Sequence, residues 1–116
     1  MTQEYIGTKH VTAWEAYKDG EPGYSVKYAD GYISWSPKEV FEAAYVGLGH
    51  IGHLPQRQQC VLGERAELAV KITALEGDIK APAFEAVPGH EQQRLKIQLD
   101  AMRIYHDVLM DRIAAF

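Results

Sequence analysis

Apolar and polar residues alternate through the first third of the chain, with the period of two that is typical of β-strands. The alternation runs over residues 24–28 and resumes over residues 33–35. Between these runs, Asp30-Gly31 is a dipeptide typical of two-residue hairpin turns. A hairpin folded there sets Val26 opposite Trp35 and predicts one half-buried apolar face. The residues expected on this face are Tyr24, Val26, Tyr28, Ile33 and Trp35.

Signals on either side of this hairpin predict two further elements. Residues 9–14 are a candidate first strand. After the hairpin, Ser36 is placed to cap a helix that starts at Pro37, and Glu39 completes a capping box. Gly47 is the expected end of this short helix.

From residue 56 onward the apolar positions recur every three or four residues, which is the period of an α-helix. The pattern predicts one helix over Gln56–Lys80 and a second over Glu91–Ala115, with a proline-containing turn between them. The expected fold class is therefore α+β. It comprises an N-terminal module over residues 1–54, with a small antiparallel β unit and a short helix, and a long two-helix hairpin domain over residues 55–116.

The last predicted helix has two apolar stripes that face roughly opposite ways. The first stripe consists of Leu95, Leu99, Met102, Leu109, Ile113 and Phe116, and the second consists of Ile97, Ala101, Ile104 and Val108. Because one partner helix covers only one of the two stripes, the other must meet the N-terminal unit or another copy of the chain, and another copy is favoured. The alternative is a central helix buried within a single chain, for which so short a sequence offers little covering surface.

Composition indicates the class of protein and the cellular compartment that we expect. The chain has 116 residues, of which 47 % are hydrophobic, so it can form a core. A single cysteine, Cys60, and a start without a signal-peptide pattern favour the cytoplasm. No apolar run is long enough to cross a membrane. The net charge of −4 argues against binding to nucleic acid polymers.

The positive charges are unevenly distributed along the chain. Up to Leu54 the cations are four lysines against seven acids, whereas all five arginines lie later, at positions 57, 65, 94, 103 and 112. Arginine is suited to bidentate contacts with phosphate groups. A few converging arginines would bind a small anion without making the whole protein basic. A scatter of ordinary surface arginines is the alternative.

Residue types that catalysis often uses are present, but no spacing joins them into a site. His50 and His53 have the H-x-x-H spacing of metal ligands, yet they lie in a glycine-rich linker without a third ligand nearby. Cys60 and His106 have no local signature of a nucleophile and its base. We therefore expect no enzymatic activity, no metal and no cofactor.

Two stretches of the chain resemble proteins that phages encode. Residues 24–28 and 31–45 resemble a small phage N-terminal module with the signature G-Y-x-S-W-S-P-K-x-x-F-E-x-x-Y. Residues 82–84, 91–95, 102–105 and 109–113 resemble the helical hairpin shared by two phage anti-defence sponges. One of these blocks Thoeris immunity and the other blocks cyclic-oligonucleotide (CBASS) immunity. The two-part arrangement is similar to the Thoeris anti-defence sponge.

This resemblance implies binding without catalysis. Proteins of that family bind a glycocyclic ADP-ribose signal, and some also bind cyclic di- or trinucleotides. They assemble into dimers and hexamers with ligand pockets between subunits. The expected function is therefore a sponge that sequesters cyclic nucleotide immune signals in the cytoplasm of the bacterial host. The alternative is a phage accessory protein that binds another protein through the same hairpin.

Six residues are candidates for ligand binding: Phe84, Arg94, Arg103, Arg112, Arg57 and Trp35. The ring of Phe84 is expected to stack on the ligand, and the three arginines of the last helix are expected to contact phosphates. Arg57 is a candidate for a second pocket, and Trp35 for a pocket wall. Structural alternatives are an ion pair of Arg103 with Asp107, and a hydrophobic staple of Trp35 with Val40.

Overall fold

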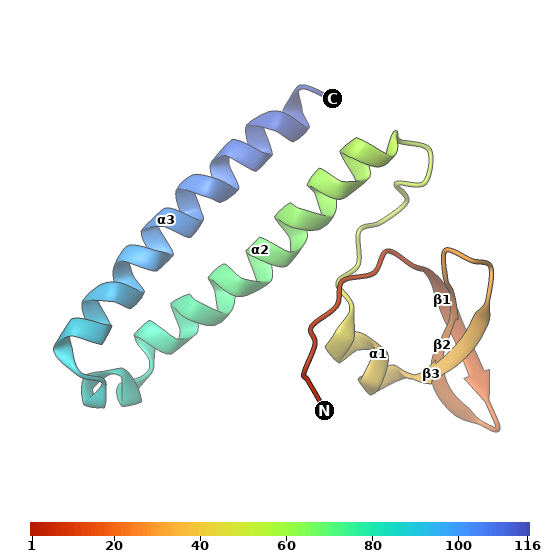
Figure 1. Cartoon of the computed structure of the whole chain (residues 1–116), viewed down its shortest axis with the longest axis horizontal. Coiled ribbons are helices and arrows are strands. Elements are labelled where there is room, and N and C mark those ends of the chain that lie inside the picture. The colour runs from red at the N-terminus through yellow and green to blue at the C-terminus, as the bar shows by residue number, and fades with distance from the viewer. The chain divides into compact units, whose positions relative to one another are not determined.

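The computed structural model describes the whole chain, residues 1–116, which forms two compact units, Met1–Tyr45 and Val46–Phe116. The first unit contains a three-stranded antiparallel sheet and a short helix, and the second is a long helical hairpin (Figure 1). The predicted α+β fold class is confirmed by these elements.

Strands β1 (Thr12–Lys18) and β2 (Glu21–Lys27) form the first hairpin of the sheet. Asp19 and Gly20 connect them with φ angles of 51° and 79°. Positive φ at both central residues is what a type I′ turn requires, and its twist matches that of the flanking strands. The prediction of a strand over residues 9–14 is wrong at both ends: the strand begins at Thr12 and continues to Lys18, where this Asp-Gly turn ends it.

The second hairpin joins β2 to β3 (Ile33–Pro37) through a longer turn than predicted. The Tyr28 N–H donates to the Tyr32 carbonyl, and the Gly31 N–H donates to the Tyr28 carbonyl, at 2.9 Å each. Gly31 has a φ of 91°, and the Tyr32 N–H donates to Asp30 Oδ1 at 2.9 Å. The loop is therefore residues 29–31, a three-residue turn with glycine in the left-handed position.

This longer loop shifts the strand register by one residue from the predicted one. Val26 pairs with Ser34, and Trp35 pairs with Ser25. Because successive side chains of a strand point to opposite faces, Trp35 lies on the other face of the sheet from Val26. The prediction of one apolar face shared by both residues is wrong.

Helix α1 (Lys38–Ala44) is tied to the sheet through aromatic side chains. The Tyr24 ring stacks on Phe41 with centroids 4.3 Å apart, and Phe41 stacks on Tyr45 at 4.7 Å. The Tyr24 hydroxyl donates to Glu42 Oε2 at 2.8 Å, and this hydrogen bond raises the pKa of Tyr24. Phe41, Glu42 and Tyr45 therefore hold α1 on the sheet through Tyr24.

The predicted capping of α1 is wrong at both ends. Pro37, rather than Ser36, precedes the first helical residue, and no side chain caps the helix. Ser36 is still paired with Tyr24 in the sheet, and its hydroxyl donates to the Pro37 carbonyl instead. At the other end the backbone is already extended at Tyr45, before Gly47.

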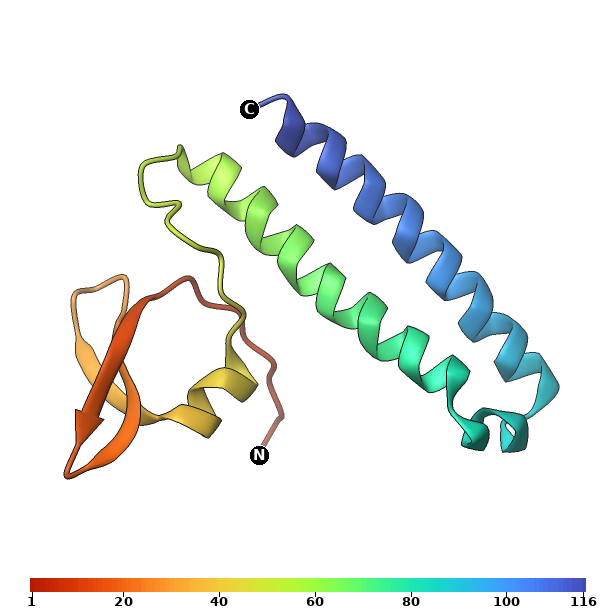
Figure 2. The same ribbon diagram turned by 180° about the vertical axis from the view of Figure 1, so that it is seen from behind.

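Helices α2 (Gln56–Lys80) and α3 (Gly89–Ala114) run side by side in opposite directions, joined by the 3₁₀ helix η1 (Pro82–Ala86) (Figures 1 and 2). Ala81 is extended, as is favoured for a residue before a proline, and this ends α2. The two predicted helices are confirmed: α2 has its predicted bounds, and α3 begins two residues earlier and ends one residue earlier than predicted.

An apolar seam between α2 and α3 holds the hairpin together. Val61, Leu68 and Leu109 form its buried cluster, against which Ile72, Met102 and Ile113 pack. Leu109 exposes none of its surface. The stripe of α3 that the partner helix covers is therefore the first one, at Met102, Leu109 and Ile113.

The second stripe of α3 is left uncovered by α2. Ile97, Ile104 and Val108 expose 60 %, 67 % and 51 % of their surface. Ala101, between them, is also exposed. A line of exposed aliphatic side chains on one helix is typical of a contact surface.

Candidate ligand-binding site

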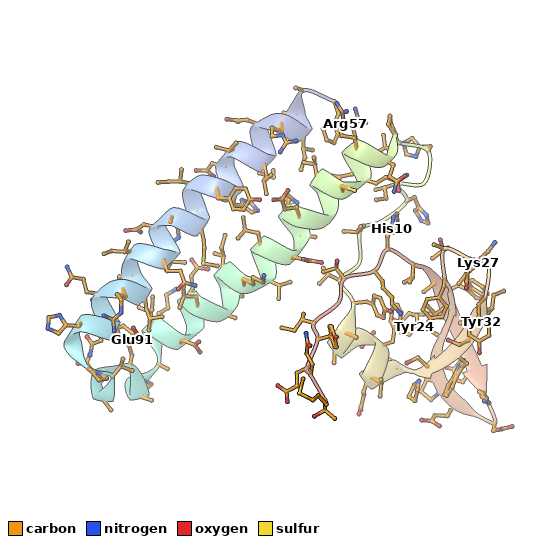
Figure 3. The ribbon with its side chains drawn as sticks, viewed as in Figure 1. His10, Tyr24, Lys27, Tyr32, Arg57 and Glu91 are labelled. Carbon is orange, nitrogen blue, oxygen red and sulfur yellow. The ribbon has the colours of Figure 1, made fainter.

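Five of the six candidate residues lie on the helical hairpin. Arg57 is in the first turn of α2, Phe84 is in η1, and the remaining three arginines are on α3. Figure 3 shows Arg57 at the open end of the hairpin, where the C-terminus also lies, and Glu91 at the closed end near η1. The sixth candidate, Trp35, belongs to β3 in the N-terminal unit.

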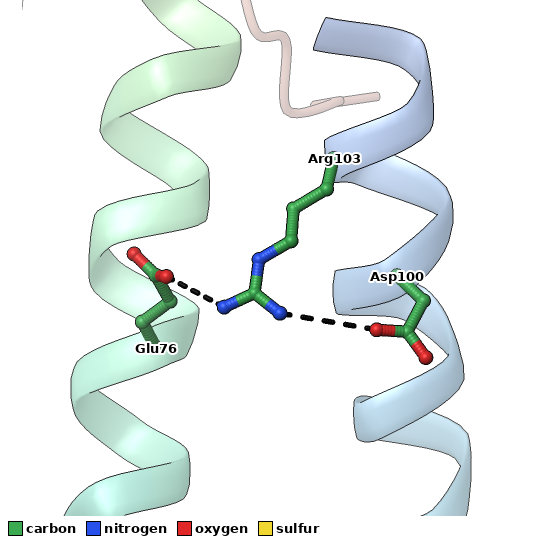
Figure 4. Close-up of polar contacts among 3 residues, drawn as sticks. All are labelled: Glu76, Asp100 and Arg103. Carbon is green, nitrogen blue, oxygen red and sulfur yellow. Dashed lines mark hydrogen bonds and ion pairs between the residues drawn. The ribbon is translucent and has the colours of Figure 1, made fainter. Parts of the chain in front are cut away.

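Arg103 links the two helices of the hairpin (Figure 4). Its Nη2 donates to Glu76 Oε2 on α2 at 2.6 Å, and its Nη1 lies 3.8 Å from Asp100 Oδ1. The hydrogen bond from Arg103 holds the pKa of Glu76 below its usual value. The structural alternative was an ion pair with Asp107, but the carboxylates that Arg103 contacts are those of Glu76 and Asp100. A phosphate at Arg103 would have to displace the Glu76 carboxylate.

The other candidate arginines are held less firmly by carboxylates of the same chain. Arg94 Nε donates to Glu91 Oε1 at 2.8 Å, but the Arg94 side chain is 69 % exposed. An ion pair so open to solvent contributes little. Arg57 and Arg112 are exposed and form no ion pair in the structure. The hairpin therefore carries accessible guanidinium groups on both helices.

The periodicity of α3 places its three arginines on two different sides. Arg94 and Arg112 are eighteen positions apart, which is about five complete turns, so they lie on one line along the helix. Arg103 is nine positions from each, about two and a half turns, so it points the opposite way. Within one chain, Arg94 and Arg112 are also separated by roughly 27 Å along the helix axis. The three side chains therefore do not converge in a single chain.

Phe84 is part of the packing of the turn. Only 7 % of its surface is exposed. Gln92 Nε2 donates to the carbonyls of Phe84 and Val87, at 3.0 and 2.8 Å, and so fastens η1 to the start of α3. Lys96 Nζ lies 5.8 Å from the Phe84 ring centroid. The ring offers little free face for stacking, and the cation beside it was not among the predicted residues.

Trp35 also has contacts of its own within the sheet. Its ring lies over Gly23, where an added Cβ atom would come within 2.4 Å of ring atoms. Its Nε1 donates to the Ala16 carbonyl at 2.9 Å, and Lys18 Nζ lies 5.6 Å from the ring. Val40, the expected partner in a hydrophobic staple, is 61 % exposed. The indole therefore stabilises the sheet.

One feature of the N-terminal unit was absent from the sequence-based predictions. The rings of Tyr28 and Tyr32 stack at 6.0 Å, and Lys9 Nζ lies 5.1 Å from the Tyr28 ring. These side chains line an open groove together with His10. The sequence signal that could have indicated this groove is the pair of tyrosines on either side of the Asp30-Gly31 turn.

The histidines and Cys60 form no cluster with acidic residues. His50, His53 and Cys60 are exposed, and His106 is half-buried. No group of three or more histidine, cysteine, aspartate or glutamate side chains is arranged to hold a metal ion. None of the helices combines the length and apolar character that crossing a membrane requires.

Comparison with known proteins identifies the hairpin. No curated protein and no solved structure matches the chain. The Sequestin family model matches residues 55–115, which include all of α2 and η1 and α3 to its end. This match covers more than half of the chain. The protein therefore belongs to the Sequestin family.

Proposed function

We propose that this protein sequesters a cyclic nucleotide immune signal and holds it without cleaving it. The observation that carries the proposal is the match of the complete hairpin to the Sequestin family, whose name denotes sequestration. All five arginines of the chain lie within the matched segment. The resemblance to phage sponges suggests glycocyclic ADP-ribose as the ligand, or a cyclic di- or trinucleotide, in the cytoplasm of a bacterial host.

The chemistry of the exposed arginines supports an anionic ligand. A guanidinium group donates two parallel hydrogen bonds to a phosphate, and it keeps its charge at any physiological pH. Arg57 and Arg112 have no carboxylate partner to displace, and Arg94 has only the exposed Glu91. Binding to these groups requires no chemical step. We therefore propose a binding protein rather than an enzyme.

Sequestration sets a condition on affinity. The protein must bind the signal more tightly than the immune effector does, and it must outnumber the signal. A dissociation constant of about 1 µM corresponds to about −8 kcal/mol, which a few charge-assisted hydrogen bonds and one stacked base can supply.

A protein-binding module is the second candidate function. The exposed second stripe of α3 favours it, because a row of aliphatic side chains also suits a helix of another protein. In that case the arginines would be ordinary surface residues, and no nucleotide would bind.

One experiment separates these functions. The purified protein is incubated in turn with a cyclic ADP-ribose isomer, a cyclic dinucleotide and a cyclic trinucleotide. Free ligand is removed by gel filtration, the protein is heat-denatured, and the supernatant is analysed by mass spectrometry. Release of intact ligand supports sequestration, and release of an altered ligand indicates an enzyme. Failure to retain any ligand contradicts the proposal and leaves the protein-binding module.

A matched pair of variants tests the role of the arginines in the same assay. Arg112→Gln removes an unpaired cation from α3, and Lys71→Gln removes an exposed cation from α2. We expect Arg112→Gln to reduce the amount of retained ligand at least tenfold and Lys71→Gln to change it less than twofold. Equal effects of the two substitutions would mean that only net charge matters.

A further inference from the structure

The turn between β1 and β2 contains a reactive dipeptide. Asp-Gly is the sequence in which an aspartate side chain cyclises most readily, because glycine has no Cβ atom to hinder the backbone nitrogen that follows the aspartate. The chain contains two such dipeptides, Asp19-Gly20 and Asp30-Gly31, and no asparagine. We propose that Asp19 is a site of spontaneous isoaspartate formation, and that this modification weakens the pairing of β1 with β2. The proposal does not depend on the binding of any nucleotide.

The modification needs no reagent other than water. The backbone nitrogen of Gly20 attacks the side-chain carboxyl carbon of Asp19 and loses its proton, and one water molecule leaves as a succinimide ring closes. A second water molecule then opens the ring at either of its two carbonyl groups. One opening restores aspartate. The other makes the main chain run through the former side chain and leaves the former backbone carbonyl carbon as the free carboxylate. The isoaspartate product has the mass and charge of aspartate, but one more carbon atom in the main chain.

Both reacting groups of Asp30-Gly31 are held by hydrogen bonds. Asp30 Oδ1 accepts a hydrogen bond from the Tyr32 N–H at 2.9 Å. The Gly31 N–H donates to the Tyr28 carbonyl, also at 2.9 Å. Cyclisation would have to break both hydrogen bonds, because the same carboxyl group and the same nitrogen atom form the new bond. The fold therefore protects Asp30.

The same two groups are free in the first turn. Asp19 and Gly20 are exposed, and the Asp19 carboxylate forms neither a hydrogen bond nor an ion pair. The Gly20 N–H has no acceptor. The remaining aspartates lie within helices, where the nitrogen that would attack already donates to the carbonyl four residues earlier. These are Asp78, Asp100, Asp107 and Asp111. Asp19 is therefore expected to be the most reactive aspartate of the chain.

Closure of a two-residue turn depends on the length of its backbone. Lys18 pairs with Glu21 at the end of the β1–β2 ladder, and Asp19 and Gly20 connect them with both φ angles positive. An additional main-chain carbon at position 19 lengthens this turn and removes the geometry of type I′. We therefore expect the ladder to open from this end.

Strand β1 has few other contacts that hold it in the sheet. It is an edge strand, with β2 as its one neighbouring strand. The Ala16 carbonyl accepts a hydrogen bond from Trp35 Nε1 at 2.9 Å, and Lys18 Nζ lies 5.6 Å from the Trp35 ring. Both contacts involve residues within three positions of Asp19. Opening of the turn therefore moves β1 away from the indole ring of Trp35, which becomes more exposed.

Ageing of the full-length protein in water labelled with oxygen-18 tests the site. Each passage through the succinimide adds one oxygen atom from the solvent, and electron-based fragmentation in a mass spectrometer distinguishes isoaspartate from aspartate. A tryptic digest separates the two positions, because Lys27 lies between them. After several weeks at physiological temperature and mildly acidic pH, we expect several times more isoaspartate at Asp19 than at Asp30. Equal amounts at both positions, more at Asp30, or none at either would overturn the proposal.

Ageing in concentrated guanidinium chloride tests whether the fold causes the difference. The unfolded chain has neither of the hydrogen bonds at Asp30-Gly31, so we expect the two dipeptides to react at similar rates there. A preference for Asp19 of the same size in the unfolded chain would mean that neighbouring residues decide the reactivity, and it would overturn the protection by the fold.

Urea unfolding followed by tryptophan fluorescence tests the effect on β1. Both tryptophans of the chain, Trp14 and Trp35, lie in this sheet. The matched control is Asp19→Gly, which keeps a residue suited to a positive φ but has no carboxyl group to cyclise. Each protein is compared with its own fresh sample. We expect the aged wild type to unfold at a lower urea concentration in proportion to its isoaspartate content, whereas aged Asp19→Gly keeps its midpoint.

Enzymatic repair completes this test. A protein isoaspartate methyltransferase with S-adenosylmethionine esterifies the isoaspartate carboxylate, and the ester closes to the succinimide again, from which aspartate is recovered. Repair should therefore return the aged wild type to the midpoint of the fresh protein. An unchanged midpoint in isoaspartate-containing protein, an equal loss in aged Asp19→Gly, or a loss that repair does not reverse would overturn the link between the modification and β1.

Discussion

Truncation of Leu109 to alanine is the sharpest test of how the hairpin is held together. Leu109 is fully buried in the seam and belongs to the cluster with Val61 and Leu68. The hairpin has few other buried side chains, so a cavity at this point is expected to affect its whole stability. Ile104 on the same helix is 67 % exposed and serves as the matched aliphatic control.

The magnitude follows from the burial of each residue. Leucine to alanine removes three carbon atoms from the core, which costs about 2.4 kcal/mol in transfer free energy at about 0.8 kcal/mol per carbon. The cavity that remains brings the expected loss to about 3–5 kcal/mol. For a unit of this size, each 1 kcal/mol lowers the melting temperature by about 4–8 °C, so we expect a fall of more than about 10 °C. Ile104→Ala should cost less than about 1 kcal/mol in dilute protein, because its side chain is already largely in water.

The assay is thermal and guanidinium unfolding followed by far-UV circular dichroism, at a low and a high protein concentration. The contact between copies expected from the sequence predicts that Ile104→Ala loses stability at high concentration, because association would stabilise the wild type there. A loss of under about 1 kcal/mol for Leu109→Ala would show that the seam is not packed as described. Equal losses for both variants in dilute protein would refute the division of α3 into a buried and an exposed stripe.

Three further predictions concern local contacts. Gly23→Ala should destabilise the N-terminal unit by about 1–3 kcal/mol in tryptophan-fluorescence unfolding, because its methyl group would collide with the Trp35 ring; a neutral effect would contradict that packing. Asp30→Ala should cost about 1 kcal/mol in the same assay, since it removes the acceptor that closes the 29–31 loop, and Asp30→Asn should recover part of the loss. Glu76→Gln should destabilise the hairpin more at pH 7 than at acidic pH. The pKa of Glu76 is lowered in the folded state, so its stabilisation is present above its ordinary pKa and is lost as the pH falls through the folded value. Urea unfolding, which adds no salt, measures this effect over a series of pH values, and an effect of the same size at every pH would rule out the ion pair with Arg103 as its cause.

The helical half of the fold could be predicted closely because its signal is repeated. Apolar residues return every three or four positions over Gln56–Lys80, and no single position decides the outcome. The proline at position 82 then fixes where the helix ends. The exposed stripe of α3 follows from the same periodicity, since a helix with two apolar sides has only one partner in the hairpin.

The presence of an antiparallel sheet could be predicted, but the register of its strands could not. One additional loop residue before Asp30 moves every side chain of β3 to the other face. The glycine is left-handed in both turns, but Asp19 also has a positive φ, whereas Asp30 does not and accepts a hydrogen bond from the Tyr32 N–H. A two-residue Asp-Gly turn has the same sequence signature, so the residue pattern alone does not distinguish them.

For the candidate site, positions on a helix could be predicted but contacts across the hairpin could not. The spacing of Arg94 and Arg112 is fixed by helix geometry alone. The pairing of Arg103 with Glu76 depends on how α2 and α3 align, and these residues are far apart in the sequence. The burial of Phe84 likewise depends on the folding of η1 and on the hydrogen bonds from Gln92.

Equilibrium dialysis of the wild-type protein against a cyclic ADP-ribose isomer, a cyclic dinucleotide and a cyclic trinucleotide tests sequestration most directly. Sequestration predicts a dissociation constant below about 1 µM for at least one of them, and full recovery of the unmodified compound. The absence of measurable binding for all three at concentrations of about 100 µM would contradict it.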